Sequence, residues 1–153
     1  MSPQLASEFI SDCGVRLYFD SLIVKPAGAV GSGWHKDMTN SPFAAGKGAA
    51  ARFLTLWIPL GPVPLAAGAL RFAAGSHKEW RLTEGDHRTA ALQQLIDRSA
   101  TMSPVISPRA AAGDASVHSG QTLHSVLPNT GMTDRAVMTI IFVAESAPVL
   151  NAP

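Results

Sequence analysis

Proline and glycine interrupt this chain so often that long regular elements have little room to form. The sequence holds 11 prolines and 13 glycines in 153 residues, and the stretches between them are short and rich in β-branched or aromatic residues. Such spacing is typical of an all-β domain, in which turns recur every few residues. It predicts seven or eight short strands folded as a sandwich or small barrel.

The strands are predicted where apolar runs end at turn residues. We expect extended segments at Arg16–Lys25, Trp34–Met38, Arg52–Leu60, Gly68–His77, Met102–Pro108, Ala115–His118, His124–Leu127 and Arg135–Ala144. One helical insert is expected at His87–Arg98, with Asp86 as a plausible N-cap. Its predicted apolar face consists of Ala91, Leu92, Leu95 and Ile96.

Length and composition indicate one domain, residues 1–153, with enough apolar sequence for its own core. The net charge of +1, without a Lys/Arg run, argues against a nucleic-acid partner. No signal peptide is visible, and the most apolar stretch, Ala136–Ala144, is far shorter than the roughly 20 residues that span a bilayer. Because Cys13 is the only cysteine, no intrachain disulfide can form. We therefore expect a cytoplasmic protein with no membrane partner; the oligomeric state is not indicated.

The segment Gly33–Asn40, GWHKDMTN, places a histidine and an aspartate two residues apart. In an extended segment, residues i and i+2 project from the same face. His35 and Asp37 can therefore point together into a barrel, with Lys36 directed away. An imidazole and a carboxylate so placed can chelate a metal, and a second histidine would complete a facial triad that leaves positions open on Fe(II).

Four other histidines are candidates for the third ligand. His77 falls in a turn and His87 at the polar start of the helical insert, which leaves His118 and His124.

Arg135 opens the last predicted strand, whose face continues through Val137, Thr139 and Ile141. An arginine there could fork two N–H donors onto the carboxylate of a co-substrate. The alternative is a surface salt bridge, for instance with Asp134 or Glu145, which would stabilise little.

Several blocks, in order, resemble the phytanoyl-CoA dioxygenase family of Fe(II)/2-oxoglutarate oxygenases. They are WHKD, LTLWIPL, GALRFAAGSHKE and GDASVHSGQTLHSVLPNTGMTDRAVMTIIF, and the similarity covers roughly Leu17 to Val143. The resemblance implies a double-stranded β-helix, a jelly-roll barrel like that of cupins. It also implies dependence on Fe(II), 2-oxoglutarate and O2, with a small-molecule substrate and release of succinate and CO2.

The resemblance also implies residue roles. His35, Asp37 and His124 would be the metal ligands, Arg135 the clamp on 2-oxoglutarate, and Trp57 part of the co-substrate pocket, with ordinary core packing as the alternative for Trp57. His118 would not be a ligand. Related halogenases have a small residue where Asp37 stands, so the carboxylate predicts hydroxylation, or another oxidation such as desaturation or ring closure.

The chain departs from the family pattern at two places of interest. Relatives often have serine or threonine two residues past the distal histidine, where this chain has Val126. Relatives are also longer and begin with helices and extra strands that this chain is expected to lack. Two alternative functions follow: a catalytically silent barrel that binds metal or 2-oxoglutarate, and a cupin-type metalloenzyme without co-substrate. A cupin has no need of Arg135.

Overall fold

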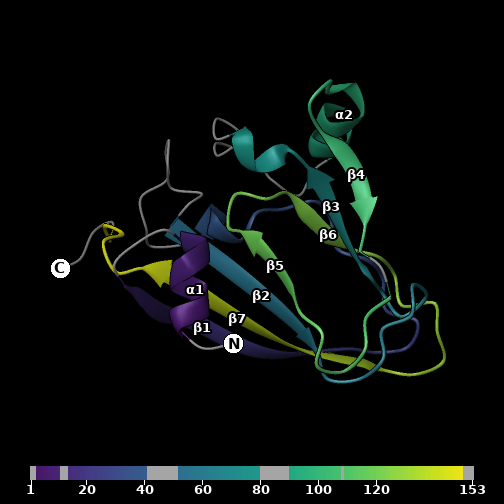
Figure 1. Ribbon diagram of the computed structural model, residues 1–153. Coiled ribbons are helices and arrows are strands. Elements are labelled where there is room, and N and C mark those ends of the chain that lie inside the picture. The colour runs from purple at the N-terminus through teal and green to yellow at the C-terminus, as the bar shows by residue number, and fades with distance from the viewer. Residues whose placement is uncertain (1–2, 11–13, 41–51, 80–89, 108, 150–153) are drawn as a thin grey trace.

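The computed structural model describes residues 3–10, 14–40, 52–79, 90–107 and 109–149, and the ribbon is shown in Figure 1. Its strands are β1 (Val15–Lys25), β2 (Phe53–Pro59), β3 (Leu70–Ala74), β4 (Ser103–Ile106), β5 (Ser116–Ser119), β6 (His124–Val126) and β7 (Arg135–Ala144). Its helices are α1 (Pro3–Ile10) and α2 (Ala90–Arg98), with 3-10 turns η1 (Asp37–Asn40) and η3 (Ser76–Lys78).

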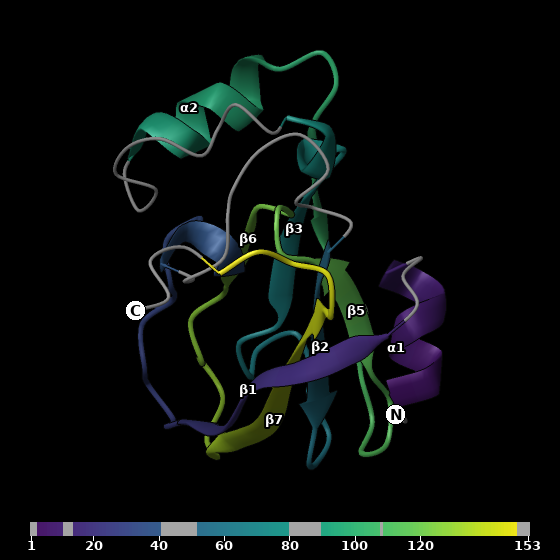
Figure 2. The ribbon, with the colours of Figure 1, turned by 90° about the vertical axis from the view of Figure 1, so that its left-hand side faces the viewer.

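Two antiparallel sheets face each other and form the barrel (Figures 1 and 2). The larger sheet has the strand order β1-β7-β2-β5, and the smaller has β4-β3-β6. Consecutive strands thus alternate between the sheets along much of the chain, as the winding of a double-stranded β-helix requires. The predicted all-β, jelly-roll fold is confirmed, and the prediction for the last strand, Arg135–Ala144, gave the bounds of β7.

Strand β2 is buried at six of its seven positions because both of its faces are covered. Its inner face looks into the barrel. Against its outer face lies α1 (Figure 2). Ala6 and Ile10 of α1 belong to the same apolar cluster as Leu54 and Leu56. The sequence analysis did not predict α1, which is only eight residues long.

The helical insert α2 packs against the smaller sheet. Leu92 and Ile96 join an apolar cluster with Trp34 and Leu123, whereas Leu95, predicted on the same face, is 38% exposed. The insert is therefore fixed by packing beside the segment that carries the His-x-Asp motif. The predicted cap Asp86 and residue His87 lie outside the described residues. Among the described helices, none has the length and apolar character needed to cross a membrane.

The turn after β3 links the smaller sheet to the entry of β6. Gly75 adopts a left-handed conformation with φ of 88°, which glycine reaches without the steric cost of a side chain. The following residue, Ser76, is fully buried, and its hydroxyl accepts a hydrogen bond of 2.9 Å from the backbone N–H of Leu123. The turn thereby fixes the residue that immediately precedes His124.

Candidate metal centre

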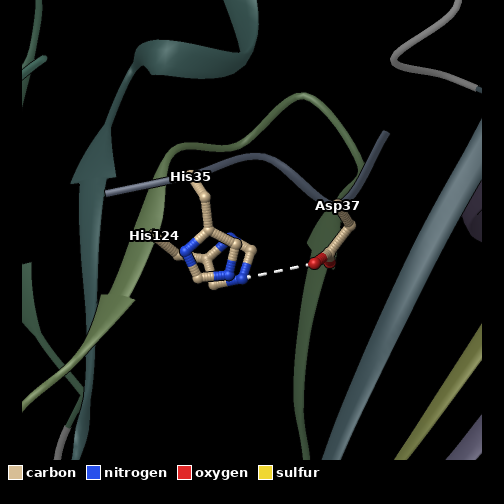
Figure 3. A group of neighbouring side chains, drawn as sticks. All are labelled: His35, Asp37 and His124. Carbon is tan, nitrogen blue, oxygen red and sulfur yellow. Dashed lines mark ion pairs between the residues drawn. The ribbon is translucent and has the colours of Figure 1, made fainter. Parts of the chain in front are cut away.

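The backbone itself brings His35 and His124 together. The N–H of each residue donates to the carbonyl oxygen of the other at 3.0 Å, forming an isolated antiparallel bridge. The two imidazole rings lie with their centroids 4.3 Å apart (Figure 3). The extended conformation predicted for the motif is therefore present at His35, which pairs with His124 at the edge of β6.

Asp37 reaches the same place by a different route from the one predicted. The chain leaves the extended conformation after His35, and Asp37 is the first residue of the 3-10 turn η1. Lys36 does point away from the cluster, but it is buried, and its Nζ donates to Oε1 of Gln121 at 2.9 Å. Burial lowers the pKa of Lys36 to about 8, although the charge of Glu79 acts in the opposite direction.

The three predicted metal ligands converge. One ligand atom from each of His35, Asp37 and His124 lies within 4.8 Å of the others, and this is the group found among the described residues that could hold a metal ion (Figure 3). The three side chains supply two imidazole nitrogens and a carboxylate oxygen. This donor set suits Fe(II), leaving coordination positions open for other ligands.

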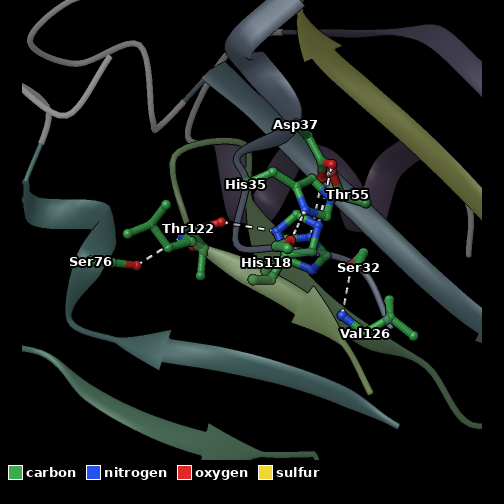
Figure 4. Close-up of polar contacts among 11 residues, drawn as sticks. Ser32, His35, Asp37, Thr55, Ser76, His118, Thr122 and Val126 are labelled. Carbon is green, nitrogen blue, oxygen red and sulfur yellow. Dashed lines mark hydrogen bonds and ion pairs between the residues drawn. The ribbon is translucent and has the colours of Figure 1, made fainter. Parts of the chain in front are cut away.

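The two oxygens of the Asp37 carboxylate have different surroundings (Figure 4). Oδ2 accepts a hydrogen bond of 2.5 Å from the Thr55 hydroxyl and lies 3.2 Å from Nε2 of His118. Oδ1 faces Nε2 of His124 at 3.4 Å. Because Oδ2 is already occupied by two donors, Oδ1 is the oxygen left to face the ligand imidazoles.

Backbone carbonyls determine which imidazole nitrogen is available. Nδ1 of His35 lies 2.9 Å from the carbonyl oxygen of Gly33, and Nδ1 of His124 lies 3.0 Å from that of Thr122. A carbonyl can only accept, so each Nδ1 carries a proton, and Nε2 is the nitrogen of each ring that can bind a metal once it is deprotonated. This is the usual outer arrangement around a metal-binding histidine.

The electrostatics keep the carboxylate ionised. Burial alone would raise the pKa of Asp37, but hydrogen bonds from His118 and His124 hold it well below its usual range. Burial dominates at His118 and lowers its pKa. At His124 burial acts in the same direction, yet the hydrogen bond and charge of Asp37 outweigh it and raise the pKa.

Register places a second row of side chains deeper in the barrel. Thr55 pairs with His118 across the sheet, and two residues further along β2 Trp57 pairs with Ser116 of β5 and Thr139 of β7. Residues opposite each other in register share a face, as do residues i and i+2. Trp57, Ser116 and Thr139 therefore line the same interior face as the metal cluster.

Arg135 extends this face toward the far end of the barrel. It is 4% exposed, and its guanidinium carbon lies 5.2 Å from the centroid of the Trp57 ring. Nε and Nη2 reach the carbonyl oxygens of Ala67 and Gly68 at 3.5 and 3.4 Å, while Nη1 is buried with no partner. Burial lowers its pKa. No carboxylate among the described residues forms an ion pair with Arg135, so the alternative of a surface salt bridge does not hold.

Sequence reasoning missed three contributors to the site. Thr55 carries no motif, and only its register opposite His118 would have revealed it. Ser116 and Thr139 were seen as strand residues without a role. His77, discounted from sequence as a ligand, lies in η3 and is not part of the metal-ligand group.

A family model confirms the resemblance. The model described as phytanoyl-CoA dioxygenase (PhyH) matches residues 3–137. The chain belongs to the phytanoyl-CoA dioxygenase family. Members of this family use Fe(II), 2-oxoglutarate and O2, and the His–Asp–His group fits such a metal.

Solved structures share the fold. The non-heme alpha-ketoglutarate-dependent carbocyclase SnoK from nogalamycin biosynthesis superposes with a TM-score of 0.79 at 24% identity, over 95% of this chain and 56% of that one. The epimerase SnoN, in complex with Fe3+, alpha-ketoglutarate and nogalamycin RO, gives 0.76 at 24% identity, over 97% of this chain and 57% of that one. EvdO2 from Micromonospora carbonacea var. aurantiaca, complexed with 2-oxoglutarate, superposes with a TM-score of 0.70 at 21% identity, over 99% of this chain and 61% of that one.

The chain thus spans little more than half the length of these three structures. No curated protein matches the sequence.

Proposed function

We propose that this protein is an Fe(II)- and 2-oxoglutarate-dependent dioxygenase that oxidises a small organic molecule and releases succinate and CO2. One observation carries the proposal: His35, Asp37 and His124 converge on one side of a barrel whose interior continues to a buried, unpaired guanidinium at Arg135. A cupin-type metalloenzyme would give that guanidinium no anionic partner, and an unpaired buried charge is costly.

Different residues would bind the metal, bind the co-substrate and orient the metal ligands. His35, Asp37 and His124 would hold the metal through Nε2, Oδ1 and Nε2, and Arg135 would bind the distal carboxylate of 2-oxoglutarate, with Trp57 alongside. Fe(II) and 2-oxoglutarate, when bound, supply the activation of O2 for attack on an unactivated C–H bond. Thr55 and His118 orient the Asp37 carboxylate through Oδ2. Such outer contacts usually set the geometry and affinity of a metal site.

The organic substrate has space next to the metal cluster. A cavity of about 390 Å³ is lined by residues that include His118, Ser116 and Phe72, a size within the usual range for small-molecule sites. The Phe72 ring lies 5.3 Å from that of His118 and shields this side of the cluster.

We propose hydroxylation as the outcome. Asp37 occupies the place that a halogenase leaves open for chloride, so halogenation is disfavoured. Desaturation or ring closure use the same first steps, and the fold relatives include a carbocyclase and an epimerase. We also propose that residues 1–153 act as one domain in the cytoplasm, because the single cysteine suits a reducing compartment.

Two measurements test the function. Anaerobic addition of Fe(II) and 2-oxoglutarate should produce a weak visible charge-transfer band, and admission of O2 should then yield succinate. A band without succinate would instead support the catalytically silent barrel. Folded protein that shows neither would exclude both.

A further inference from the structure

Three buried polar atoms around Trp57 have no hydrogen-bond partner in the part of the chain that the structure describes. The hydroxyl oxygens of Ser116 and Thr139 and Nη1 of Arg135 are each shielded from solvent, and none has a hydrogen-bond partner among the described residues. Buried polar groups are nearly always paired, so each such atom needs an explanation. Their common location suggests one explanation for all three.

The register brings the three groups to one level of the barrel. Ser116 and Thr139 flank Trp57 directly, one on each neighbouring strand. The guanidinium of Arg135 reaches back to the same level, where its carbon lies 5.2 Å from the Trp57 ring centroid. Two hydroxyl donors and a cationic N–H donor therefore surround one tryptophan, and together they match the acceptors of a carboxylate.

The level of Trp57 and the metal cluster are separated by two residues along β2. Thr55, which donates to Asp37, lies two residues before Trp57 on β2, and two residues of strand extend about 6.6–6.8 Å. A dicarboxylate of five carbons can bridge that span. Ser116 also lines both the cavity of about 390 Å³ beside His118 and a cavity of about 430 Å³ lined by Trp57, so open space adjoins this residue.

We propose that Ser116 and Thr139 donate hydrogen bonds to the distal carboxylate of 2-oxoglutarate and so complete, with Arg135, the site that selects a dicarboxylate. This proposal rests on the function proposed above. Val126 of the smaller sheet packs against the apolar cluster that contains Trp57, and its side chain has no donor, so the two hydroxyls of the larger sheet supply the neutral donors here. Both are positioning residues for the co-substrate.

The test compares two ligands on protein loaded with Fe(II) under anaerobic conditions. Binding of 2-oxoglutarate is measured by calorimetry for the unmodified protein, Ser116→Ala and Thr139→Val. Loss of a hydrogen bond to a carboxylate should weaken 2-oxoglutarate binding about tenfold or more in each variant. 2-Oxopentanoate, which keeps the keto-acid head but lacks the distal carboxylate, should bind all three proteins with equal affinity.

A matched control lies on the same strand. Ser119 faces the opposite side of β5, where its hydroxyl pairs with that of Thr122 at 3.1 Å, and Ser119→Ala should leave 2-oxoglutarate binding unchanged. A second readout is thermal unfolding without ligand. Since the two hydroxyls have no partner in the empty barrel, Ser116→Ala and Thr139→Val should unfold no earlier than the unmodified protein.

Each outcome is decisive. Equal 2-oxoglutarate affinity in the variants, equal weakening for both ligands, or early unfolding without ligand would overturn the role of the hydroxyls and leave the dioxygenase proposal standing. Failure of the unmodified protein to bind 2-oxoglutarate would overturn the dioxygenase proposal itself.

Discussion

Nε2 of His118 lies 3.2 Å from Oδ2 of Asp37, whereas Nε2 of His124, whose ring centroid is 4.5 Å from that of His118, faces the other oxygen, Oδ1, at 3.4 Å. The contact gives His118 a position close to the metal cluster without making it part of the ligand group. It also explains how one carboxylate can serve two neighbours, since each oxygen faces a different imidazole. From this arrangement we expect the two histidines to respond differently to substitution.

His124→Ala should abolish Fe(II) binding because it removes a ligand atom. His118→Ala should retain the metal, with affinity lowered about tenfold, as is usual when an outer hydrogen bond to a ligand is lost. Anaerobic titration with Fe(II) distinguishes the two variants. The reverse result would mean that His118 is the third ligand.

Metal affinity should rise with pH. The contact with Asp37 raises the pKa of His124 in the metal-free protein, and a metal must displace that proton. Below the raised pKa, each pH unit should therefore change the affinity by about tenfold. Titration with Mn(II) between pH 6 and 8 measures the slope, and a flat profile would contradict this prediction.

The same pKa shift of His124 affects the stability of the metal-free protein, which should fall as the pH rises, whereas metal affinity should increase. A raised folded-state pKa means that protonated His124 stabilises the metal-free fold below about pH 6.5. That contribution is lost as the pH rises through the raised value. The His124→Asn variant should show a smaller change in the midpoint of thermal unfolding over this window.

The insert α2 should stabilise the segment that carries the metal ligands. Trp34 immediately precedes His35 in the chain, and its Nε1 donates a hydrogen bond to Oε1 of Gln93 at 2.7 Å. Gln93→Ala leaves this indole N–H without its partner and should lower the free energy of unfolding by about 1 kcal/mol or more. Gln94→Ala, an exposed change in the same helix, is the control and should have little effect.

The turn at Gly75 should tolerate no side chain. A Cβ there would lie 2.3 Å from the carbonyl oxygen of Thr101, in addition to the cost of a positive φ. Gly113 has a similar φ of 93° but open space around it, so Gly113→Ala should cost only about 1–2 kcal/mol. Chemical denaturation should show a clearly larger loss for Gly75→Ala; equal losses would mean that the turn can shift.

Predictions from the sequence are correct where side-chain pattern and local geometry agree. The apolar run Arg135–Ala144 has one stable arrangement, a buried strand, and β7 has those bounds. The family motifs indicated His124 and Arg135, and both residues are buried in the fold. Asp37 shows the limit: the i, i+2 argument gave the correct convergence for a wrong reason, because the chain turns into η1 after His35.

Other features depend on tertiary contacts that no local pattern reveals. Helix α1 is too short to predict from periodicity, and it is held by packing on β2. The roles of Thr55, Ser116 and Thr139 follow from cross-strand register, which the sequence does not specify without the pairing partners. Lys36 was expected to point away from the metal cluster, but its burial against Gln121 could be seen only in the fold.

Because the backbones of His35 and His124 are hydrogen-bonded to each other, folding of the polypeptide brings these two distant segments together without help from the ion. We therefore expect iron to enter after folding is complete and to exchange while the barrel stays folded. Preparations stripped by a chelator should accordingly regain occupancy on simple addition of the ion, with no denaturation and renaturation cycle.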